Sequence, residues 1–521
     1  MKRSLLAIAA AFSVMFFIPF GADAQENDAV VSKIIETGKT DNQVMVHEDM
    51  LANRIGGRIV GSDALLRAEQ WVKKQLEKWG YEVTLQQVGT MPVGFNRGPW
   101  SGRMLSEDGM VLHFGTPSYT AGTKGPQKGH VVIEPRTREE FQRMKKTIAG
   151  AWVLIGGKSN GFALDGSAKA NEKRNAILQK NDSIRKVNRE IRAWNEKHKD
   201  KKKEMLQEDQ TPALLYKEMV EAGALGFIQS AKVPITVLYN RANCNDFTID
   251  SLPTVCDIKL DSKQYDIIYE KASRREDFLL EFDIRNHFIE GPVPFSNVIA
   301  VMKGSEYPDE YVISGGHLDS YDASCGAIDD GQGVSVNLES ARLLALAGAK
   351  PKRSIMFAIW TAEEFGLLGS KYFVQNNTVD LDKISNYFNR DGGPQVASSV
   401  TVIPAMYDDF VAAAEGINDI NPDFPFEVIK NEAPARPRPK SAGGSDHAYF
   451  AKNSVPTVSI NLSDVKGYNF SYGEIWHSER DNYNKCIPEY MEHSAIVNAI
   501  LIYRLANLDH ILNRTGLYSD K

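Results

Sequence analysis

The chain has 521 residues, of which 42% are hydrophobic and 25% are charged, and these are ordinary proportions for a globular protein. They exclude an intrinsically disordered or collagen-like chain, and four cysteines are too few for a disulfide-dense scaffold. The net charge of −6 argues against a nucleic-acid-binding protein, because no basic excess is present to neutralise phosphates. The length predicts about two to four domains.

The first residues have the layout of a secretory signal peptide. Two basic residues precede an apolar run over 5–20, and Ala22-Asp23-Ala24 supplies a small-x-small cleavage site. The run is shorter than the roughly 20 apolar residues that a membrane-spanning helix needs. We therefore expect residues 1–24 to be removed and the mature chain to be secreted or periplasmic, without a membrane anchor.

The mature chain begins with the predicted first part of one domain, over residues 25–120. Residues 62–79 have the apolar spacing of an amphipathic helix, with Ser62 or Asp63 as the candidate N-cap and Gly80 after its end. Residues 81–88 alternate like a strand. A Gly/Pro-rich stretch that includes Gly122 and Gly125 then suggests a domain boundary.

Short β runs predict a β-rich module over residues 121–290. Within it lies a charged segment, about 168–210, that has the pattern of a solvated helix. Its apolar residues form a heptad-like stripe: Ile177, Ile184, Val187, Ile191 and Trp194. Cys244 and Cys256 are close enough in sequence to form a disulfide, but two free thiols fit equally well.

Residues 291–521 alternate between apolar runs of strand length and helical stretches. Strands are predicted at 297–302, 311–314 and 354–360. Strand-helix alternation of this kind is typical of an α/β domain with a largely parallel sheet. The middle module therefore interrupts one α/β domain, and the N-terminal helix belongs to that domain.

Histidines and carboxylates follow the predicted strands of this domain. In an open α/β sheet, ligands bind outside the carboxyl ends of the strands. The candidates, in chain order, are His317 with Asp319, the pair Asp329 and Asp330, the pair Glu363 and Glu364, Asp391, and His477. Each lies just after a strand or in a loop, so we expect these groups to converge at one edge of the sheet.

Two histidines and three carboxylates suit a site for two Zn²⁺ ions. Each ion needs three protein ligands and an open position for water, so five residues serve two ions if one carboxylate bridges them. Water held between two ions loses its proton near neutral pH and becomes a hydroxide nucleophile. A free carboxylate beside it can take that proton and deliver it to a leaving amine. The pattern therefore predicts a hydrolytic site.

Five segments together resemble the zinc peptidases of the M28 family: HLDS at 317–320, GAIDDGQG at 326–333, TAEEFGLLGS at 361–370, RDGG at 390–393 and WH at 476–477. The run HLDSYDASCGAIDDGQG is most similar to the carboxypeptidase Q (plasma glutamate carboxypeptidase) branch. The middle module is similar to the protease-associated domain of those enzymes. The resemblance implies a three-layer α/β/α domain with a mostly parallel central sheet, interrupted by a β-rich protease-associated domain.

The resemblance also implies a role for each candidate residue. One zinc ion would be held by His317, Asp329 and Asp391, and the other by Asp329, Glu364 and His477, with Asp329 as the bridge. Glu363 resembles the general base of the family, and Asp319 resembles the residue that orients His317. We choose Asp329 over Asp330 because it is the first acid of the D-D-G-x-G pattern. Cys325 is expected to pack the loop and not to bind metal.

The implied function is a secreted di-zinc exopeptidase that cuts dipeptides or short peptides. The loop after His317 favours carboxypeptidase or dipeptidase specificity, whereas the GGSDH segment at 443–447 resembles aminopeptidase members. Candidate carboxylate-binding arginines, chosen by proximity in sequence, are Arg390, Arg436, Arg438 and Arg480. A homodimer is compatible with the family, although no residue pattern predicts one.

Two readings from other classes stay open. A glutaminyl cyclase would share the scaffold and use one working zinc ion, although the D-D-G-x-G bridge counts against it. A non-catalytic ectodomain would have lost ligands that are all present here.

Overall fold

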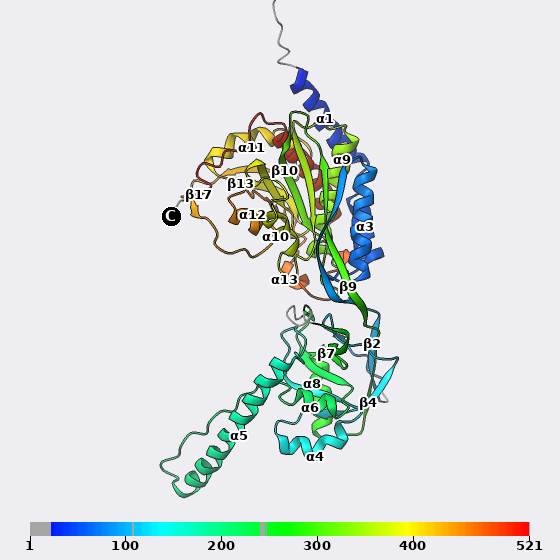
Figure 1. The fold of residues 1–521 in the computed structure, drawn as a ribbon, viewed down its shortest axis with the longest axis vertical. Coiled ribbons are helices and arrows are strands. Elements are labelled where there is room, and N and C mark those ends of the chain that lie inside the picture. Colours follow the sequence, from blue (N-terminus) through cyan, green and yellow to red (C-terminus); the bar gives the residue numbers. More distant parts are fainter. Residues whose placement is uncertain (1–21, 107–108, 240–244, 246, 520–521) are drawn as a thin grey trace, which may run out of the picture.

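The computed structural model describes residues 22–106, 109–239, 245 and 247–519, which form a main domain and an inserted domain. The main domain comprises residues 22–99 and 285–519, and the inserted domain comprises residues 100–284. Figure 1 shows the inserted domain at one end of the molecule, joined to the main domain by two long strands. Most of the predicted signal peptide, together with Cys244, lies outside the described residues.

The main domain contains a central five-stranded sheet. Its strand order is β1-β9-β11-β10-β12, with bounds Glu82–Asn96, His287–Met302, Arg353–Trp360, Tyr307–His317 and Ile384–Asn389. β10 pairs in parallel with β11 and β12, whereas β9 is antiparallel to both of its neighbours. Four of the five strands therefore run in one direction, which confirms the predicted mostly parallel sheet.

Helices cover both faces of this sheet. Alternate residues of β9 point to opposite faces, so Val298 and Ala300 belong to one apolar core and Ile299 to another. The first face packs against α1 (Ala22–Thr40), α3 (Asp63–Lys78), α9 (Gln332–Leu346) and α14 (Pro488–Ala506). The second face packs against α10 (Leu368–Gln375) and α12 (His447–Lys452). The result is the expected three-layer arrangement (Figure 1).

The helix predicted over residues 62–79 is α3. Ser62 caps α3, and its hydroxyl oxygen accepts a hydrogen bond from the Leu65 N–H at 3.1 Å. Leu65, Val72 and Leu76 are buried on the side of the helix that faces the sheet. Among the described helices, none combines the length and the apolar character needed to cross a membrane.

Smaller elements complete the main domain. A second sheet has the strand order β14-β13-β16, with bounds Glu427–Lys430, Val396–Val402 and Ile460–Ser463. Two short strands, β15 (Arg436–Pro437) and β17 (Tyr518–Ser519), pair with each other. The short helices include α2 (Val44–Glu48), α11 (Tyr407–Ala413) and α13 (Tyr472–Ile475).

The inserted domain has a seven-stranded sheet with the strand order β2-β8-β4-β5-β6-β7-β3. Its strands are Trp100–Leu105, Leu279–Ile284, Gln127–Ile133, Ala151–Lys158, Gly226–Ala231, Cys256–Asp261 and Phe114–Gly115, in that order. Helices α4 (Arg138–Ile148), α6 (Tyr216–Glu221) and α8 (Ser262–Ser273) flank it. Cys256 is buried and free.

The inserted domain begins before the predicted boundary at residue 121. β2 pairs with β8 from Trp100 opposite Ile284 to Leu105 opposite Leu279, so residues 100–105 belong to the inserted sheet. The Gly/Pro-rich stretch around Gly122 lies between β3 and β4 and does not separate the two domains. On the other side, β9 starts at His287, slightly before the predicted boundary at residue 291.

The charged segment forms an arm that projects from the inserted domain (Figure 1). Helix α5 spans Ala168–Lys197 and ends before the predicted residue 210, because the chain turns back along it. Three asparagines each form two hydrogen bonds with the backbone of one returning residue: Asn181 with Asp209, Asn188 with Leu206, and Asn195 with Lys203. Seven helical residues rise about 10.5 Å and three extended residues span about 10 Å, so the two spacings match.

Candidate metal centre

The predicted ligands converge at the carboxyl ends of the central strands. His317 is the last residue of β10, Glu364 follows β11, and Asp391 follows β12. Asp329 lies in the loop before α9, and His477 lies in the loop between α13 and α14. Because β11, β10 and β12 are neighbours that run in the same direction, their ends bring these side chains together.

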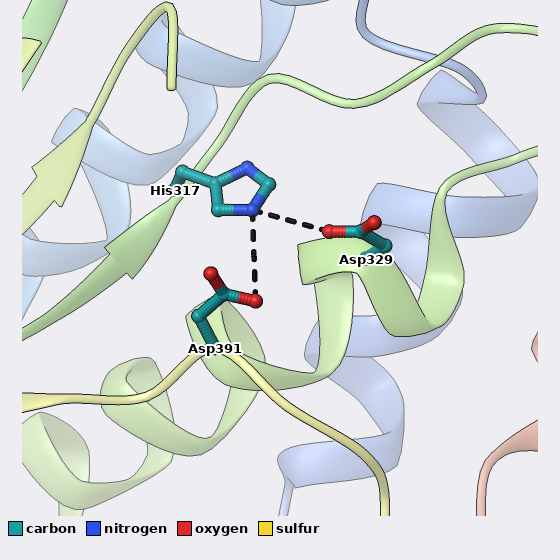
Figure 2. Close-up of side chains that lie close together, drawn as sticks. All are labelled: His317, Asp329 and Asp391. Atoms are coloured by element: carbon teal, nitrogen blue, oxygen red, sulfur yellow. Dashed lines mark ion pairs between the residues drawn. The ribbon is translucent and has the colours of Figure 1, made fainter. Parts of the chain in front are cut away.

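Five side chains form two triads with one shared member. His317, Asp329 and Asp391 form the first triad (Figure 2), and Asp329, Glu364 and His477 form the second. Within each triad the ligand atoms lie within 4.8 Å of one another. In the first triad, His317 Nε2 lies 3.2 Å from Asp329 Oδ1 and 3.9 Å from Asp391 Oδ1.

Asp329 faces both histidines with different oxygen atoms. Its Oδ1 is the atom near His317, whereas its Oδ2 lies 3.6 Å from His477 Nε2. Glu364 Oε2 lies 3.1 Å from the same nitrogen of His477. The shared carboxylate can therefore contribute one oxygen to each of two cations.

Burial and neighbouring charges shift the pKa values of the carboxylates in this cluster. It raises the pKa of Glu364 and of Asp391, and the charge of Asp329 raises both further. Burial also acts to raise the pKa of Asp329, but the hydrogen bond with His317 and the charges of the two histidines lower it overall. Buried carboxylates that lie close together repel one another, and this repulsion favours the binding of cations between them.

The two histidines shift in opposite directions. Burial lowers the pKa of His477 to about 4, so its ring is neutral near pH 7 and ready to bind a metal. Burial also acts to lower the pKa of His317, but the hydrogen bond with Asp329 and the negative charges of Glu363 and Asp391 raise it well above its ordinary value. A cation at the first triad would replace the proton of His317.

The donor set fits zinc. Two imidazoles and three carboxylates are ligands that Zn²⁺ accepts, with three donors for each ion. The five side chains are only 1–12% exposed. Within the described part of the chain, Glu364 Oε1 is buried without a hydrogen-bond partner, as expected for an oxygen that a cation would bind.

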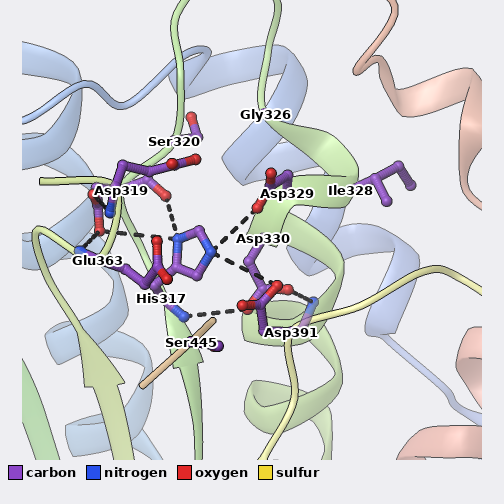
Figure 3. Close-up of polar contacts among 12 residues, drawn as sticks. His317, Asp319, Ser320, Gly326, Ile328, Asp329, Asp330, Glu363, Asp391 and Ser445 are labelled. Atoms are coloured by element: carbon purple, nitrogen blue, oxygen red, sulfur yellow. Dashed lines mark hydrogen bonds and ion pairs between the residues drawn. The ribbon is translucent and has the colours of Figure 1, made fainter. Parts of the chain in front are cut away.

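Glu363 lies beside the ligands but belongs to neither triad. Figure 3 shows it on the loop after β11, close to His317 and Asp319. Burial, with the charges of Asp446 and Glu364, raises its pKa to about 10. Divalent cations bound next to this carboxyl would lower that pKa again, so its charge depends on metal occupancy.

Asp319 connects His317 to the Glu363 loop. His317 Nδ1 lies 2.8 Å from the backbone oxygen of Asp319 and 3.9 Å from its carboxylate. That carboxylate accepts hydrogen bonds from the N–H groups of Glu363 at 3.0 Å and of Glu364 at 3.2 Å. Asp319 therefore fixes the ring through its carbonyl and the loop through its side chain (Figure 3).

Asp330 belongs to neither triad. Its carboxylate accepts hydrogen bonds from the backbone N–H groups of His317 and Gly333, both at 3.1 Å. It therefore ties the end of β10 to the start of α9. Cys325 also lies outside the triads, with its thiol donating to the backbone oxygen of Asp481 at 3.4 Å.

The GGSDH segment lies next to the first triad. Ser445 hydrogen-bonds Asp391 and accepts from Asn389 Nδ2 at 2.8 Å, and α12 begins two residues later. The arginines chosen by sequence proximity fall in different places. Arg390 is buried, Arg480 pairs with Glu474, and Arg436 and Arg438 are exposed.

Sequence reasoning missed Asp481. Its carboxylate accepts hydrogen bonds from the N–H groups of Ile328 at 2.6 Å and Asp329 at 3.2 Å, so it holds the loop of the shared ligand. Burial, followed by the charge of Asp329, raises its pKa to about 7. Its only sequence signal is its position four residues after His477, and a single acid in a loop is not specific.

Residues 297–502, which carry all five ligands, match peptidase family M28. This match, over about two fifths of the chain, supports the M28 family. Its sequence is similar to carboxypeptidase Q from Bos taurus, with 26% identity over 300 residues, which is 57% of this chain and 59% of that protein. The aligned region thus spans about three fifths of that relative. These matches support the predicted carboxypeptidase Q-like branch.

Two solved structures have a similar fold over both domains of this chain. An M28 peptidase precursor from Shewanella amazonensis is 19% identical, with a TM-score of 0.56, and the match covers 94% of this chain and 99% of that one. A zinc aminopeptidase from Bacillus subtilis is 16% identical, with a TM-score of 0.50, and the match covers 92% and 98%. At these identities, the two similarities establish the fold alone.

Proposed function

We propose that this chain is a secreted di-zinc exopeptidase that hydrolyses dipeptides or short peptides. The observation that carries the proposal is the pair of triads that share Asp329, with the unligated carboxyl of Glu363 beside them. The match of residues 297–502 to peptidase family M28 supports a metallopeptidase. We assign the inserted domain as a protease-associated domain, and we assign residues 1–24 as a signal peptide that directs the chain out of the cytoplasm.

The geometry of the two triads supports the proposed metal ligands. His317, Asp329 and Asp391 would hold one zinc ion, and Asp329, Glu364 and His477 the other. When bound, the two ions supply Lewis acidity, which polarises the peptide carbonyl and acidifies water at neutral pH. The name of the zinc aminopeptidase with the same fold supports zinc as the metal.

Glu363 moves the proton in the proposed reaction. Its carboxylate takes a proton from the attacking water and returns it to the leaving amine, so that the peptide C–N bond breaks and one water is consumed. Asp319 keeps this carboxyl in place, because it holds the backbone N–H of Glu363. Asp481 keeps the shared ligand in place through the N–H of Asp329.

We propose that the enzyme reads the carboxyl end of its substrate. The similarity to carboxypeptidase Q supports this specificity. Of the candidate arginines, Arg390 is buried and Arg480 pairs with Glu474. Arg436 and Arg438 are exposed, and they precede the GGSDH segment that reaches the first triad. An exposed guanidinium can form two hydrogen bonds to a free carboxylate.

The test is hydrolysis of one dipeptide by the zinc-loaded mature chain, beside its N-acetylated and its C-amidated forms. We expect hydrolysis of the free dipeptide and loss of hydrolysis on amidation. Loss on acetylation alone would replace the carboxypeptidase assignment with an aminopeptidase, and loss in both forms would indicate a dipeptidase. Failure to cleave any of the three forms would refute the peptidase.

A further inference from the structure

A segment of the inserted domain contacts both loops that carry ligands of the second triad. Residues 235–239 connect β6 and β7 and extend toward the main domain. They reach the loop that holds His477 and the loop that holds Glu364, although both loops belong to the main domain. Contacts of this kind make the inserted domain part of the support of the metal centre.

The first contact is a short antiparallel pairing of backbones. Thr236 forms a β-bridge with Ser478, the Val237 N–H donates to the carbonyl of His477 at 3.4 Å, and the Glu479 N–H donates to the carbonyl of Ile235 at 3.2 Å. The Glu479 side chain adds a further bond, since its Oε1 accepts from the Ile235 N–H at 3.2 Å. The loop of His477 is thus held along three consecutive residues.

His477 needs such support because its backbone is in the left-handed region. Its φ is 52°, a conformation that costs a residue with a side chain about 1 kcal/mol or more and persists only where neighbours enforce it. The hydrogen bond from the Val237 N–H to the His477 carbonyl is one such constraint. The inserted domain therefore helps to set the direction of the imidazole.

The second contact is made by Tyr239. Its hydroxyl donates a hydrogen bond to the backbone oxygen of Glu364, and its ring stacks on Phe365 with centroids 4.0 Å apart. Tyr239 is 2% exposed, so this contact is shielded from water. Tyr239 therefore holds the backbone oxygen of Glu364 and the side chain of the next residue, Phe365.

Tyr321 links these two contacts. Its ring lies 5.4 Å from that of Tyr239 and 4.1 Å from that of His477, measured between centroids. The ring of Tyr321 therefore limits rotation of the His477 imidazole, and the ring of Tyr239 packs against Tyr321. One tyrosine of the inserted domain acts on Glu364 directly and on His477 through Tyr321.

The first triad is supported by the main domain. His317 is fixed by Asp319 and Asp330, and Asp391 is fixed by Ser445. All three supporting residues lie within 285–519, the second part of the main domain. Asp319 and Asp481 of the main domain also hold ligands of the second triad. The described contacts of residues 235–239 therefore add support from the inserted domain at the second metal site.

We propose that the inserted domain completes the second metal site, with Tyr239 as the positioning residue for Glu364 and, through Tyr321, for His477. The inference rests on the proposed function for the presence of two zinc ions. It adds that the affinity of the second site depends on docking of the inserted domain, whereas the affinity of the first site does not. Outer partners of metal ligands typically change affinity by about 10- to 100-fold.

The test is zinc binding to chains that keep one complete triad. His477→Ala leaves the first triad, and Asp391→Ala leaves the second. We expect Tyr239→Phe to weaken zinc binding about 10-fold in the Asp391→Ala chain and to leave it unchanged in the His477→Ala chain. The measurement is a calorimetric titration of the metal-free protein with zinc alone, with cobalt absorption spectra as a second readout of ligand geometry.

A matched control is Tyr265→Phe. The Tyr265 hydroxyl donates to the backbone oxygen of Ile155 at 2.8 Å, so this variant removes the same kind of bond from the same domain, away from the metal site. We expect it to leave both affinities unchanged. Thermal unfolding of each metal-free variant checks that the fold is intact.

The inference would be overturned if Tyr239→Phe left the zinc affinity of the Asp391→Ala chain unchanged. It would also be overturned if Tyr239→Phe weakened zinc binding equally in the Asp391→Ala and His477→Ala chains. Tyr239→Ala, which also removes the ring, should weaken the second site more than Tyr239→Phe does. The proposed function is tested separately by peptide hydrolysis. A chain that binds zinc as expected but cleaves no peptide would refute the peptidase and leave this inference standing.

Discussion

Replacing Glu363 by glutamine should remove hydrolysis while keeping the fold and both metal sites. Glutamine has the size of glutamic acid but accepts no proton at neutral pH. Burial, together with nearby acids, raises the pKa of Glu363 to about 10, so this carboxyl is protonated at pH 7 while the cluster holds no cation. The neutral amide therefore resembles the residue as it stands in the metal-free chain, and we expect little change in stability.

The expected loss of rate follows from the role of the residue. General acid–base catalysis contributes about 10²- to 10⁴-fold, so we expect kcat of Glu363→Gln to fall by about 10³-fold, or about 4 kcal/mol of activation free energy. KM should change much less, because Glu363 belongs to neither triad. The loss should not be rescued by added zinc.

The assay is steady-state hydrolysis of a dipeptide by the zinc-loaded variant, with metal content measured on the same sample. Glu69→Gln is the matched control, because Glu69 is also a buried glutamate of the main domain with a raised pKa. We expect that control to keep its activity. A Glu363→Gln enzyme that carries two zinc ions and retains a kcat within about 10-fold of the wild type would refute the general-base assignment.

Three further predictions concern the ligands, the pH dependence and the arm. Asp329→Ala should weaken binding of both zinc ions, whereas Asp391→Ala and His477→Ala should each strongly weaken binding of one ion. The measurement is zinc content after dialysis, and an equal loss of zinc in all three variants would contradict a shared ligand. Burial raises the folded-state pKa of Glu69 from 4.5 to about 8. Between these pH values the folded chain retains a proton that the unfolded chain releases. The free energy of unfolding should therefore fall as pH rises from about 4.5 to about 8. In denaturant unfolding of the metal-free chain, Glu69→Gln should reduce the decrease of the unfolding free energy with pH by up to about 1.4 kcal/mol per pH unit. An unchanged pH dependence would contradict the pKa assignment. Asn188→Ala removes two hydrogen bonds from the arm and should destabilise its returning segment by about 1–3 kcal/mol. Hydrogen exchange near Leu206 should become faster, with unchanged peptidase activity. Unchanged exchange there would contradict the asparagine pairing.

The convergence of the candidate ligands could be predicted because the fold places them where the sequence pattern is strongest. His317, Glu364 and Asp391 each follow a buried β run, and parallel strands bring their carboxyl ends to one edge. Asp329 and Asp330 could be distinguished only by resemblance to the family pattern. In the structure, the carboxylate of Asp330 is bonded to the backbone of His317 and Gly333, which leaves Asp329 to face the histidines.

Features that depend on distant pairing were not predicted. The start of the inserted domain is set by β2 and β8, which are separated by more than 170 residues, and β2 itself carries no local sign of that partner. The end of α5 was placed too late because residues 198–210 are as charged as the helix. The seven-residue spacing of Asn181, Asn188 and Asn195 was visible in the sequence, but its partners become apparent only when the chain turns back.

Tyr239 shows the same limit at the metal centre. It lies more than 100 residues before Glu364 in the chain, on a connection of the inserted domain without a motif. Its role depends on a hydrogen bond to a backbone oxygen, and any residue can supply such an acceptor. Sequence patterns identify groups that bind metal more readily than groups that hold the ligands in place.

A zinc titration of the metal-free wild-type chain, with dipeptide hydrolysis measured at each step, tests the central claim most directly. The two triads predict two zinc ions per chain and full hydrolysis only when both are bound. A chain that reaches full activity with one zinc ion, or that binds two ions and hydrolyses no peptide, would contradict the di-zinc exopeptidase.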